Sequence, residues 1–94
     1  MQTILSGVLL MTEKLSDAQE LLQTIVHDHS VPKNIRRAAK KANDGLEVTD
    51  DPPAVRANMA ISVLDEVSQD PNCPVYSRTM IWQIVSILET VNDV

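Results

Sequence analysis

The chain has 94 residues, a formal net charge of −5 at pH 7 and 44% apolar residues, which favours one small folded domain and argues against disorder. Its two glycines are too few for a hairpin-rich β fold or a glycine-rich phosphate loop. The single cysteine fits a reducing compartment. The apolar segment 4–11 is too short to span a bilayer, and no basic region precedes it as in a signal peptide. The sequence therefore predicts a cytoplasmic protein that does not enter the membrane.

The first predicted helix covers residues 3–28. Its apolar residues alternate in spacings of four and three, which places them on one stripe of a helix: Ile4, Val8, Met11, Leu15, Ala18, Leu22 and Ile25. Ser6 and Gly7 weaken the first turns. Thr12 or Ser16 is therefore an alternative start, with residues 1–11 as an N-terminal helical extension.

A second helix is predicted to begin near Ser30, a favourable N-cap residue, with Pro32 in the first turn. Gly45 would end it in the left-handed conformation. Residues 12–46 thus form a first helix pair. The apolar face of the second helix consists of Ile35, Ala38, Ala39, Ala42 and Leu46.

The segment 47–54 is a connector, and residues 55–91 form a second helix pair. The third helix, capped by Asp50 or Asp51, carries the apolar residues Ala57, Ala60, Leu64 and Val67. The fourth runs from about Cys73, capped by Asn72, to about Val91, and is apolar on nearly all sides. Such a helix is either central in its own bundle or partly covered by another molecule.

The two helix pairs are similar in sequence. The segments DHSVPKNIRR at 28–37 and DPNCPVYSRT at 70–79 align without gaps at an offset of 42 residues. The offset superposes Asp28 on Asp70, Pro32 on Pro74 and Arg36 on Arg78, and it also superposes the apolar stripes of the two pairs. A helix-pair unit of about 40–47 residues is the period of HEAT and armadillo repeats, and the Asp, Pro and Arg of the turn resemble the HEAT pattern.

These observations predict an all-α fold, in which four main helices form two similar helical hairpins, as a HEAT-like repeat pair, in a compact bundle within one domain, 1–94. The turn aspartates can accept backbone N–H groups at the start of the next helix, and an arginine one turn later can pair with such a carboxylate. We therefore interpret these two aspartates and two arginines as structural rather than catalytic.

The second predicted helix is strongly basic. It holds five of the chain's eight basic residues within 33–41, and Lys33, Arg37, Lys40 and Lys41 share one face. One hypothesis is contact with an anion or a nucleic acid through this face. The pI near 4.7 and the absence of stacking aromatic residues nearby disfavour it. The favoured interpretation is a solvated face, partly neutralised by acidic residues on adjoining helices.

Residues suited to catalysis or metal binding are few. His27 and His29 are two positions apart, so on one helix they point in different directions, and no CxxC or HExxH motif accompanies them. Cys73 lies at a predicted helix N-terminus, a position that can lower the pKa of a thiol. Its counterpart in the first pair is Val31, which suggests instead that Cys73 is a small apolar plug. The adjacent Asp65 and Glu66 diverge on a helix. We therefore predict no enzymatic activity and no metal or cofactor.

Apolar surface left over by two repeat units predicts a symmetric homodimer, because arrays of such units usually need about three or more to bury their faces. The candidate self-association face combines Ile4, Val8 and Met11 with the side of the last helix that holds Trp82 or Val85.

Two segments resemble an archaeal family of short helical proteins, uncharacterised protein family 0147. These are VPKNIRRAAKKA in the first pair and VRANMAISVLDEVSQDPNCPVYSRTMIWQIVSILE in the second, and they leave residues 1–11 outside. The resemblance implies an all-helical archaeal protein and supplies no activity. The leading hypothesis is therefore a non-enzymatic protein–protein interaction module or adaptor whose partner protein is unknown. The alternative is a nucleic-acid or ribosome-associated factor that uses the basic face.

Overall fold

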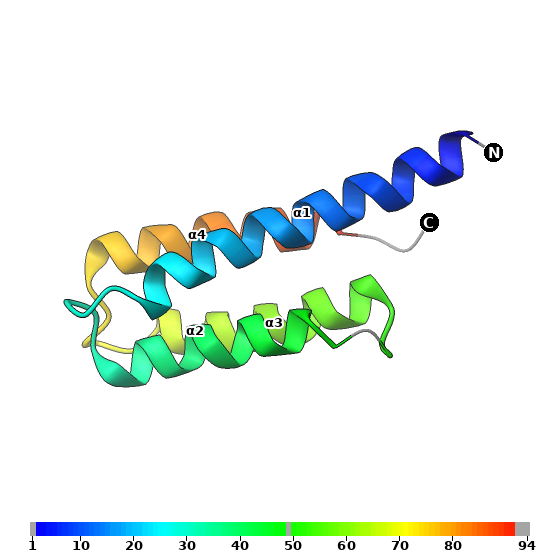
Figure 1. Cartoon of the computed structure of the whole chain (residues 1–94). Helices are drawn as coiled ribbons and strands as arrows, with labels where there is room; N and C mark the ends of the chain where they lie inside the picture. The colour runs from blue at the N-terminus through cyan, green and yellow to red at the C-terminus, as the bar shows by residue number, and fades with distance from the viewer. Residues whose placement is uncertain (1, 49, 92–94) are drawn as a thin grey trace.

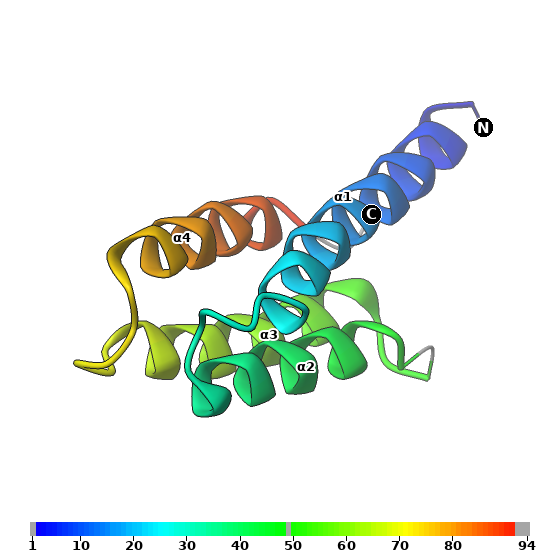
Figure 2. The ribbon, with the colours of Figure 1, turned by 60° about the vertical axis from the view of Figure 1, so that its left-hand side comes forward.

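The computed structural model describes residues 2–48 and 50–91, with side chains from residue 10 onward. It contains four α-helices and, within those residues, no β-strand: α1 Gln2–Val26, α2 Lys33–Leu46, α3 Pro53–Ser68 and α4 Val75–Glu89 (Figure 1). The predicted all-α fold is therefore confirmed. The N-terminal extension is continuous with the first helix, and its first turns project beyond the other three helices (Figures 1 and 2).

Each helix packs mainly on two neighbours, so the four form a closed ring. The contacting pairs are α1 with α2, α2 with α3, α3 with α4, and α1 with α4. In Figure 1 α1 and α4 form one layer, and α2 and α3 form the other. Each predicted hairpin, α1–α2 or α3–α4, thus contributes one helix to each layer.

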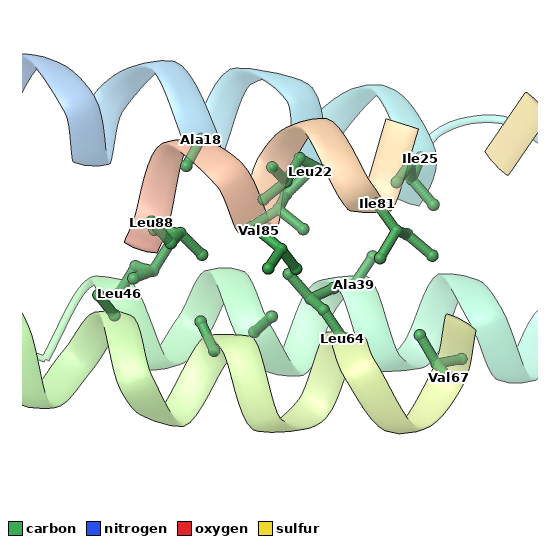
Figure 3. Close-up of a cluster of buried hydrophobic side chains, with 14 of the residues drawn as sticks. Ala18, Leu22, Ile25, Ala39, Leu46, Leu64, Val67, Ile81, Val85 and Leu88 are labelled. Atoms are coloured by element: carbon green, nitrogen blue, oxygen red, sulfur yellow. The ribbon is translucent and has the colours of Figure 1, made fainter. Parts of the chain in front are cut away.

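The core lies between these layers (Figure 3). The apolar stripe of α1 from Met11 to Ile25 is buried, as the 3.6-residue periodicity predicts. Positions related by the 42-residue offset are buried in pairs: Ala18 with Ala60, Leu22 with Leu64, Ile25 with Val67, Val31 with Cys73, and Leu46 with Leu88. Burial of each large aliphatic side chain contributes about 1.5–3 kcal/mol, so this matched set supplies much of the stability of the bundle.

The helices α2, α3 and α4 begin in the same way, and not as predicted. Their N-cap residues are Pro32, Pro52 and Pro74, with φ between −59° and −54° and ψ between 149° and 152°, and no side chain caps them. The predicted caps, Ser30, Asp50 or Asp51, and Asn72, are therefore wrong. The prolines hold the extended conformation that an N-cap needs, and they have no N–H that would require a partner.

Gly45 does not end the second helix in the left-handed conformation. No described residue has a positive φ, and α2 continues through Gly45 to Leu46, with Glu47 as an ordinary right-handed C-cap. The Glu47 N–H donates to the Asp44 carbonyl at 3.2 Å, which closes the last turn without a glycine.

Aspartate organises both tight turns, as the repeat predicts. The Ser30 N–H donates to Asp28 Oδ1 at 3.0 Å, and 42 residues later the Asn72 N–H donates to Asp70 Oδ1 at 2.8 Å. Each of these two hydrogen bonds closes an Asx turn, so Ser30 and Asn72 lie in the turns and not at the helix starts.

The two arginines hold the turns through backbone carbonyls and not, as predicted, through the turn carboxylates. Arg36 Nε donates to the Val31 carbonyl at 3.0 Å. Arg78 Nε donates to the Ser68 carbonyl at 2.9 Å, and Arg78 Nη2 lies 3.5 Å from the Cys73 carbonyl. Val31 and Cys73 are equivalent positions, so the structural interpretation of both arginines stands with a different acceptor.

Reciprocal contacts between the hairpins show that an approximate two-fold rotation relates them. Asn34 Nδ2 of the first hairpin donates to Asp70 Oδ2 of the second at 2.6 Å. Tyr76 Oη, at the position equivalent to Asn34, donates to Asp28 Oδ2 of the first at 2.9 Å. Units of a solenoid stack by translation instead. Two-fold packing lets the hairpins cover each other's apolar faces, which removes the main reason for expecting uncovered repeat surface.

Candidate interaction surface

The four predicted basic residues are all exposed on α2, but their surroundings differ. Lys40 Nζ forms an ion pair with Asp44 Oδ2 at 2.9 Å on the same helix, so the neutralising carboxylate does not come from an adjoining helix. Lys33, Arg37 and Lys41 form no ion pair with any residue that the structure describes. They follow one another at four-residue steps and thus form a line along α2.

This line borders a groove of about 550 Å³ between α2 and α3. The groove mixes charge with apolar surface, because Arg37 and Lys41 stand on its α2 side and Glu66 on its α3 side. The full lining consists of Asn34, Arg37, Ala38, Lys41, Val63, Glu66, Val67, Gln69, Asp70 and Pro71. Sequence analysis found the two cations but missed the α3 wall, which lies on the next helix along the chain.

One difference between this groove and the equivalent place on the other side of the bundle is Asn34, whose counterpart is Tyr76. At the equivalent place between α4 and α1, the ring of Tyr76 spans the gap to Asp28 and its hydroxyl also lies 2.6 Å from Ser30 Oγ. The shorter Asn34 reaches Asp70 without covering the neighbouring surface. The alignment at an offset of 42 residues already placed Asn34 opposite Tyr76, so a signal for this asymmetry was present in the sequence.

The residues of the predicted self-association face are not all available at the surface. Met11 and Val85 belong to the buried core, whereas Trp82 is 54% exposed. The side chains of Ile4 and Val8 lie outside those that the structure describes. Val75, two turns before Trp82 on α4, is 76% exposed, and Thr79 lies between them. We call Val75, Thr79 and Trp82 the α4 outer face.

The α4 outer face also changes the interpretation of the fourth helix. Its buried residues are Ser77, Ile81, Ile84, Val85 and Leu88, which lie on one side. The helix is therefore not buried on most of its circumference, and apolar side chains on its outer side face solvent.

The polar and titratable candidates have structural surroundings. Hydrogen bonds from the Ser30 hydroxyl, the Ser30 N–H and Tyr76 lower the pKa of Asp28 below its usual value. Cys73 is buried, as the apolar-plug interpretation predicts, and this burial raises the pKa of its thiol. His29 Nδ1 lies 3.5 Å from Arg36 Nη1. No three His, Cys, Asp or Glu side chains among the described residues are grouped to hold a metal ion.

A second, smaller groove of about 390 Å³ lies between α1 and α2. Its lining is polar and carries Glu20 and Glu47 together with Ser16, Gln19, Gln23 and Asn43. Asn43 Oδ1 is buried without a hydrogen-bond partner in the described structure, at the position where the second hairpin has Val85.

Within the described residues, none of the four helices has the length and apolar content needed to cross a membrane.

Comparisons with known proteins agree with the helical fold. A protein from Methanothermobacter thermautotrophicus is 44% identical over 87 residues, which are 93% of this chain and 85% of the relative. One from Aeropyrum pernix is 56% identical over 80 residues, which are 85% of this chain and 88% of the relative. Both are named only as UPF0147 proteins, a name that assigns no activity.

Two crystal structures are also similar. One, of a protein of unknown function, has a TM-score of 0.85 and 44% identity, and the match covers 87% of this chain and 93% of that chain. The other, from Thermoplasma acidophilum, has a TM-score of 0.83 and 30% identity over 88% of this chain and 98% of that chain. The sequence model described as Uncharacterised protein family (UPF0147) matches residues 6–91, and the chain therefore belongs to this family.

Proposed function

We propose that this protein is a non-enzymatic protein–protein interaction module or adaptor of the cytoplasm, and that the α4 outer face is its principal binding surface. The observation that carries the proposal is the exposure of large apolar side chains on one side of α4: Val75 is 76% exposed and Trp82 is 54% exposed. Exposed tryptophan is uncommon on surfaces that serve only solubility, and tryptophan is enriched among residues that dominate binding energy.

Differences between the two hairpins support this assignment. The positions of α2 that correspond to Val75, Thr79 and Trp82 are Lys33, Arg37 and Lys40. The two outer surfaces occupy equivalent places on the same fold, so folding alone does not require apolar residues on α4. If the outer side of α4 contacted only water, charged residues like those at the equivalent positions of α2 would suit it equally well. The apolar choice on α4 is therefore best explained by contact with a partner.

The alternative is a nucleic-acid or ribosome-associated factor that uses the basic face of α2. The observation in its favour is the line of Lys33, Arg37 and Lys41, which lacks ion pairs among the described residues. Against it stand Glu66 and Asp70 in the adjoining groove and a net charge of −5, both of which repel phosphate.

The test compares the unmodified protein with Trp82→Ala and with the matched control Ser86→Ala, an exposed position of the same helix. Each of the three proteins is immobilised on a resin and incubated with native extract, and the captured proteins are identified by mass spectrometry. Binding is then remeasured with the purified partner. Because Trp82 belongs to the predicted dimer face, sedimentation first establishes the oligomeric state of each variant.

We expect a purified partner to bind the unmodified protein and Ser86→Ala equally and to bind Trp82→Ala at least about thirtyfold more weakly, the size of a typical binding hot spot. Equal binding by all three would refute the assignment to the α4 outer face. A salt-dependent RNA or DNA affinity that is lost on charge reversal at Lys40 and Lys41 would favour the alternative.

A further inference from the structure

We propose that the smaller groove, between α1 and α2, binds the guanidinium group of an arginine side chain on a protein partner. This inference rests on the proposed protein-binding function but concerns a different surface from the α4 outer face. It gives a role to the amide oxygen of Asn43, which has no hydrogen-bond partner in the described part of the chain.

The lining of this groove carries two carboxylates and no cation. Glu20 lies on α1 and Glu47 at the end of α2, and both are exposed. Neither carboxylate forms an ion pair with a residue that the structure describes. The other lining residues are neutral: Ser16, Gln19, Gln23 and Asn43. The groove is therefore negative, as is the whole chain with its net charge of −5.

The basic residues nearest to the groove along the chain lie outside its lining. Lys40 forms an ion pair with Asp44 at 2.9 Å. Lys41 lines the groove between α2 and α3 instead, and Lys14 donates to the Thr90 carbonyl at the end of α4 at 3.3 Å. A cation that enters the groove thus meets two carboxylates that have no cation of their own.

Asn43 is a second observation that points to a ligand. It is only 3% exposed, and its Oδ1 has no hydrogen-bond partner among the described residues, which destabilises the fold. The other such atom in the described structure, Ser77 Oγ, lines neither groove. Asn43 belongs to the groove lining, and the last torsion of an asparagine side chain is soft. A turn of the amide can therefore present Oδ1 to an N–H group in the groove.

The second hairpin indicates that the fold does not require this amide. The position equivalent to Asn43 is Val85, which is buried in the core and has no side-chain group that needs a hydrogen bond. Gln19 in the same groove corresponds to Ile61. The polar residues at these two positions are thus specific to the groove between α1 and α2, and a ligand with several donors explains why they are there.

The oxygen atoms of the lining suit a guanidinium better than a metal ion. No three His, Cys, Asp or Glu side chains among the described residues are grouped to hold a metal. A guanidinium has five N–H donors, no acceptor and a planar fork that matches a carboxylate. Carboxylate, amide and hydroxyl oxygens all line the groove, and its volume of about 390 Å³ can hold one such group with part of its aliphatic stem.

The two-fold relation between the hairpins supplies a variant that separates ligand binding from folding. Asn43→Val copies Val85 and removes the unpartnered oxygen. The charge variants are Glu20→Gln and Glu47→Gln. Glu13→Gln is the matched control, because it makes the same change on α1 at an exposed residue that does not line the groove.

The probe is an unlabelled peptide in which arginine alternates with serine, and the control peptide replaces each arginine by citrulline, its neutral isostere. Amide chemical shifts of ¹⁵N-labelled protein locate the bound peptide, and isothermal titration calorimetry at two salt concentrations gives its affinity. Agmatine, a free guanidine, and Ca²⁺ are titrated in parallel. Urea unfolding followed by circular dichroism gives the stability of each variant.

We expect the arginine peptide to bind, to shift amides of α1 and α2 around the groove, and to bind Glu20→Gln and Glu47→Gln about threefold or more weakly. Asn43→Val should also bind more weakly and yet be at least as stable as the unmodified protein. Glu13→Gln should bind as the unmodified protein does.

Four results would overturn the inference: no binding, equal binding of the citrulline peptide, equal weakening by Glu13→Gln, or unchanged binding by Asn43→Val. The last of these would leave Asn43 with no role in binding. Agmatine that binds as tightly as the peptide would overturn the assignment to a protein partner. Ca²⁺ that binds more tightly than the peptide and displaces it would overturn the assignment to a guanidinium.

Failure here is distinguishable from failure of the proposed function. Trp82→Ala should leave the affinity for the arginine peptide unchanged, because Trp82 does not line this groove. A partner that needs Trp82 but is insensitive to Glu20→Gln and Asn43→Val would retain the interaction module and remove the groove from it.

Discussion

Arg78 is predicted to be a major stabilising residue of the second hairpin. Its guanidinium lies at the α3–α4 turn and reaches three carbonyl oxygens, those of Ser68 at 2.9 Å, Asp70 at 3.4 Å and Cys73 at 3.5 Å. Arg78→Met keeps most of the aliphatic stem and removes all three hydrogen bonds, which come from Nε and Nη2. The equivalent change in the first hairpin, Arg36→Met, removes one carbonyl bond, to Val31 at 3.0 Å.

The difference in contacts sets the expected magnitudes. A hydrogen bond from a charged group contributes about 1.5–3 kcal/mol, and long bonds contribute less. Because both arginines are half-buried and water can replace part of each bond, we expect Arg78→Met to cost about 2–4 kcal/mol and Arg36→Met about 1–2 kcal/mol. The total free energy of unfolding of a small domain is only about 5–15 kcal/mol, so the first loss is a large fraction of it.

The assay is urea unfolding followed by far-ultraviolet circular dichroism, which gives the free energy of unfolding of each variant. In thermal unfolding each 1 kcal/mol should lower the midpoint by about 4–8 °C for a domain of this size. Arg78→Lys is the control, since it keeps the charge but loses the planar fork. A cost for Arg78→Met no larger than that of Arg36→Met, or full retention of stability by Arg78→Lys, would refute the assignment of turn stability to the three carbonyl bonds.

Three further predictions concern Asp28, Cys73 and Trp82. The pKa of Asp28 is lowered in the folded state, so its carboxylate stabilises the fold above the unfolded pKa of about 3.9, and this stabilisation is lost as pH falls through the folded pKa. Asp28→Asn should therefore flatten the acid limb of a curve of unfolding free energy against pH. An unchanged acid limb would contradict this. Since burial raises the pKa of the Cys73 thiol, a thiol reagent at pH 7–8 should react with the native protein far more slowly than with the urea-unfolded chain, and equal rates would show that the thiol is accessible. If the predicted homodimer uses the exposed Trp82, sedimentation at micromolar concentration should give a dimer that Trp82→Ala shifts toward a monomer near 10.4 kDa, whereas an unmodified protein that stays monomeric on concentration would exclude it.

Periodicity predicted the core well because it depends only on local geometry. The stripe from Met11 to Ile25 and the matched positions of α3 are buried as expected. The repeat also predicted equivalent turns, and Pro32 and Pro74 adopt nearly the same φ and ψ. Each of these features is set by residues within a few turns of each other, so sequence spacing alone contains the information.

The helix starts were mispredicted because two local preferences compete for the same residues. Ser30 and Asn72 are favourable N-caps, but Asp28 and Asp70 accept their N–H groups first and place them in Asx turns. The following prolines then take the N-cap positions. Side-chain preference alone does not decide between these two arrangements.

The groove between α2 and α3 was out of reach for a different reason. Its walls, α2 and α3, are consecutive helices, but the spacing of residues along each helix does not show which of their exposed side chains line a common groove. Sequence analysis named Trp82 or Val85 for the outer side of α4, and only Trp82 is exposed, because a count of apolar residues around the helix does not show which side faces the neighbouring helices.

The approximate two-fold rotation has a consequence for chain connectivity. It makes the end of α4 and the body of α1 equivalent to the end of α2 and the start of α3, and Lys14 Nζ indeed donates to the Thr90 carbonyl at 3.3 Å. A linker as long as the natural α2–α3 connection could therefore join residue 91 to the start of the packed part of α1. The chain could then be opened within 47–52 without moving a helix, so the order of the hairpins along the polypeptide is not what holds the bundle together.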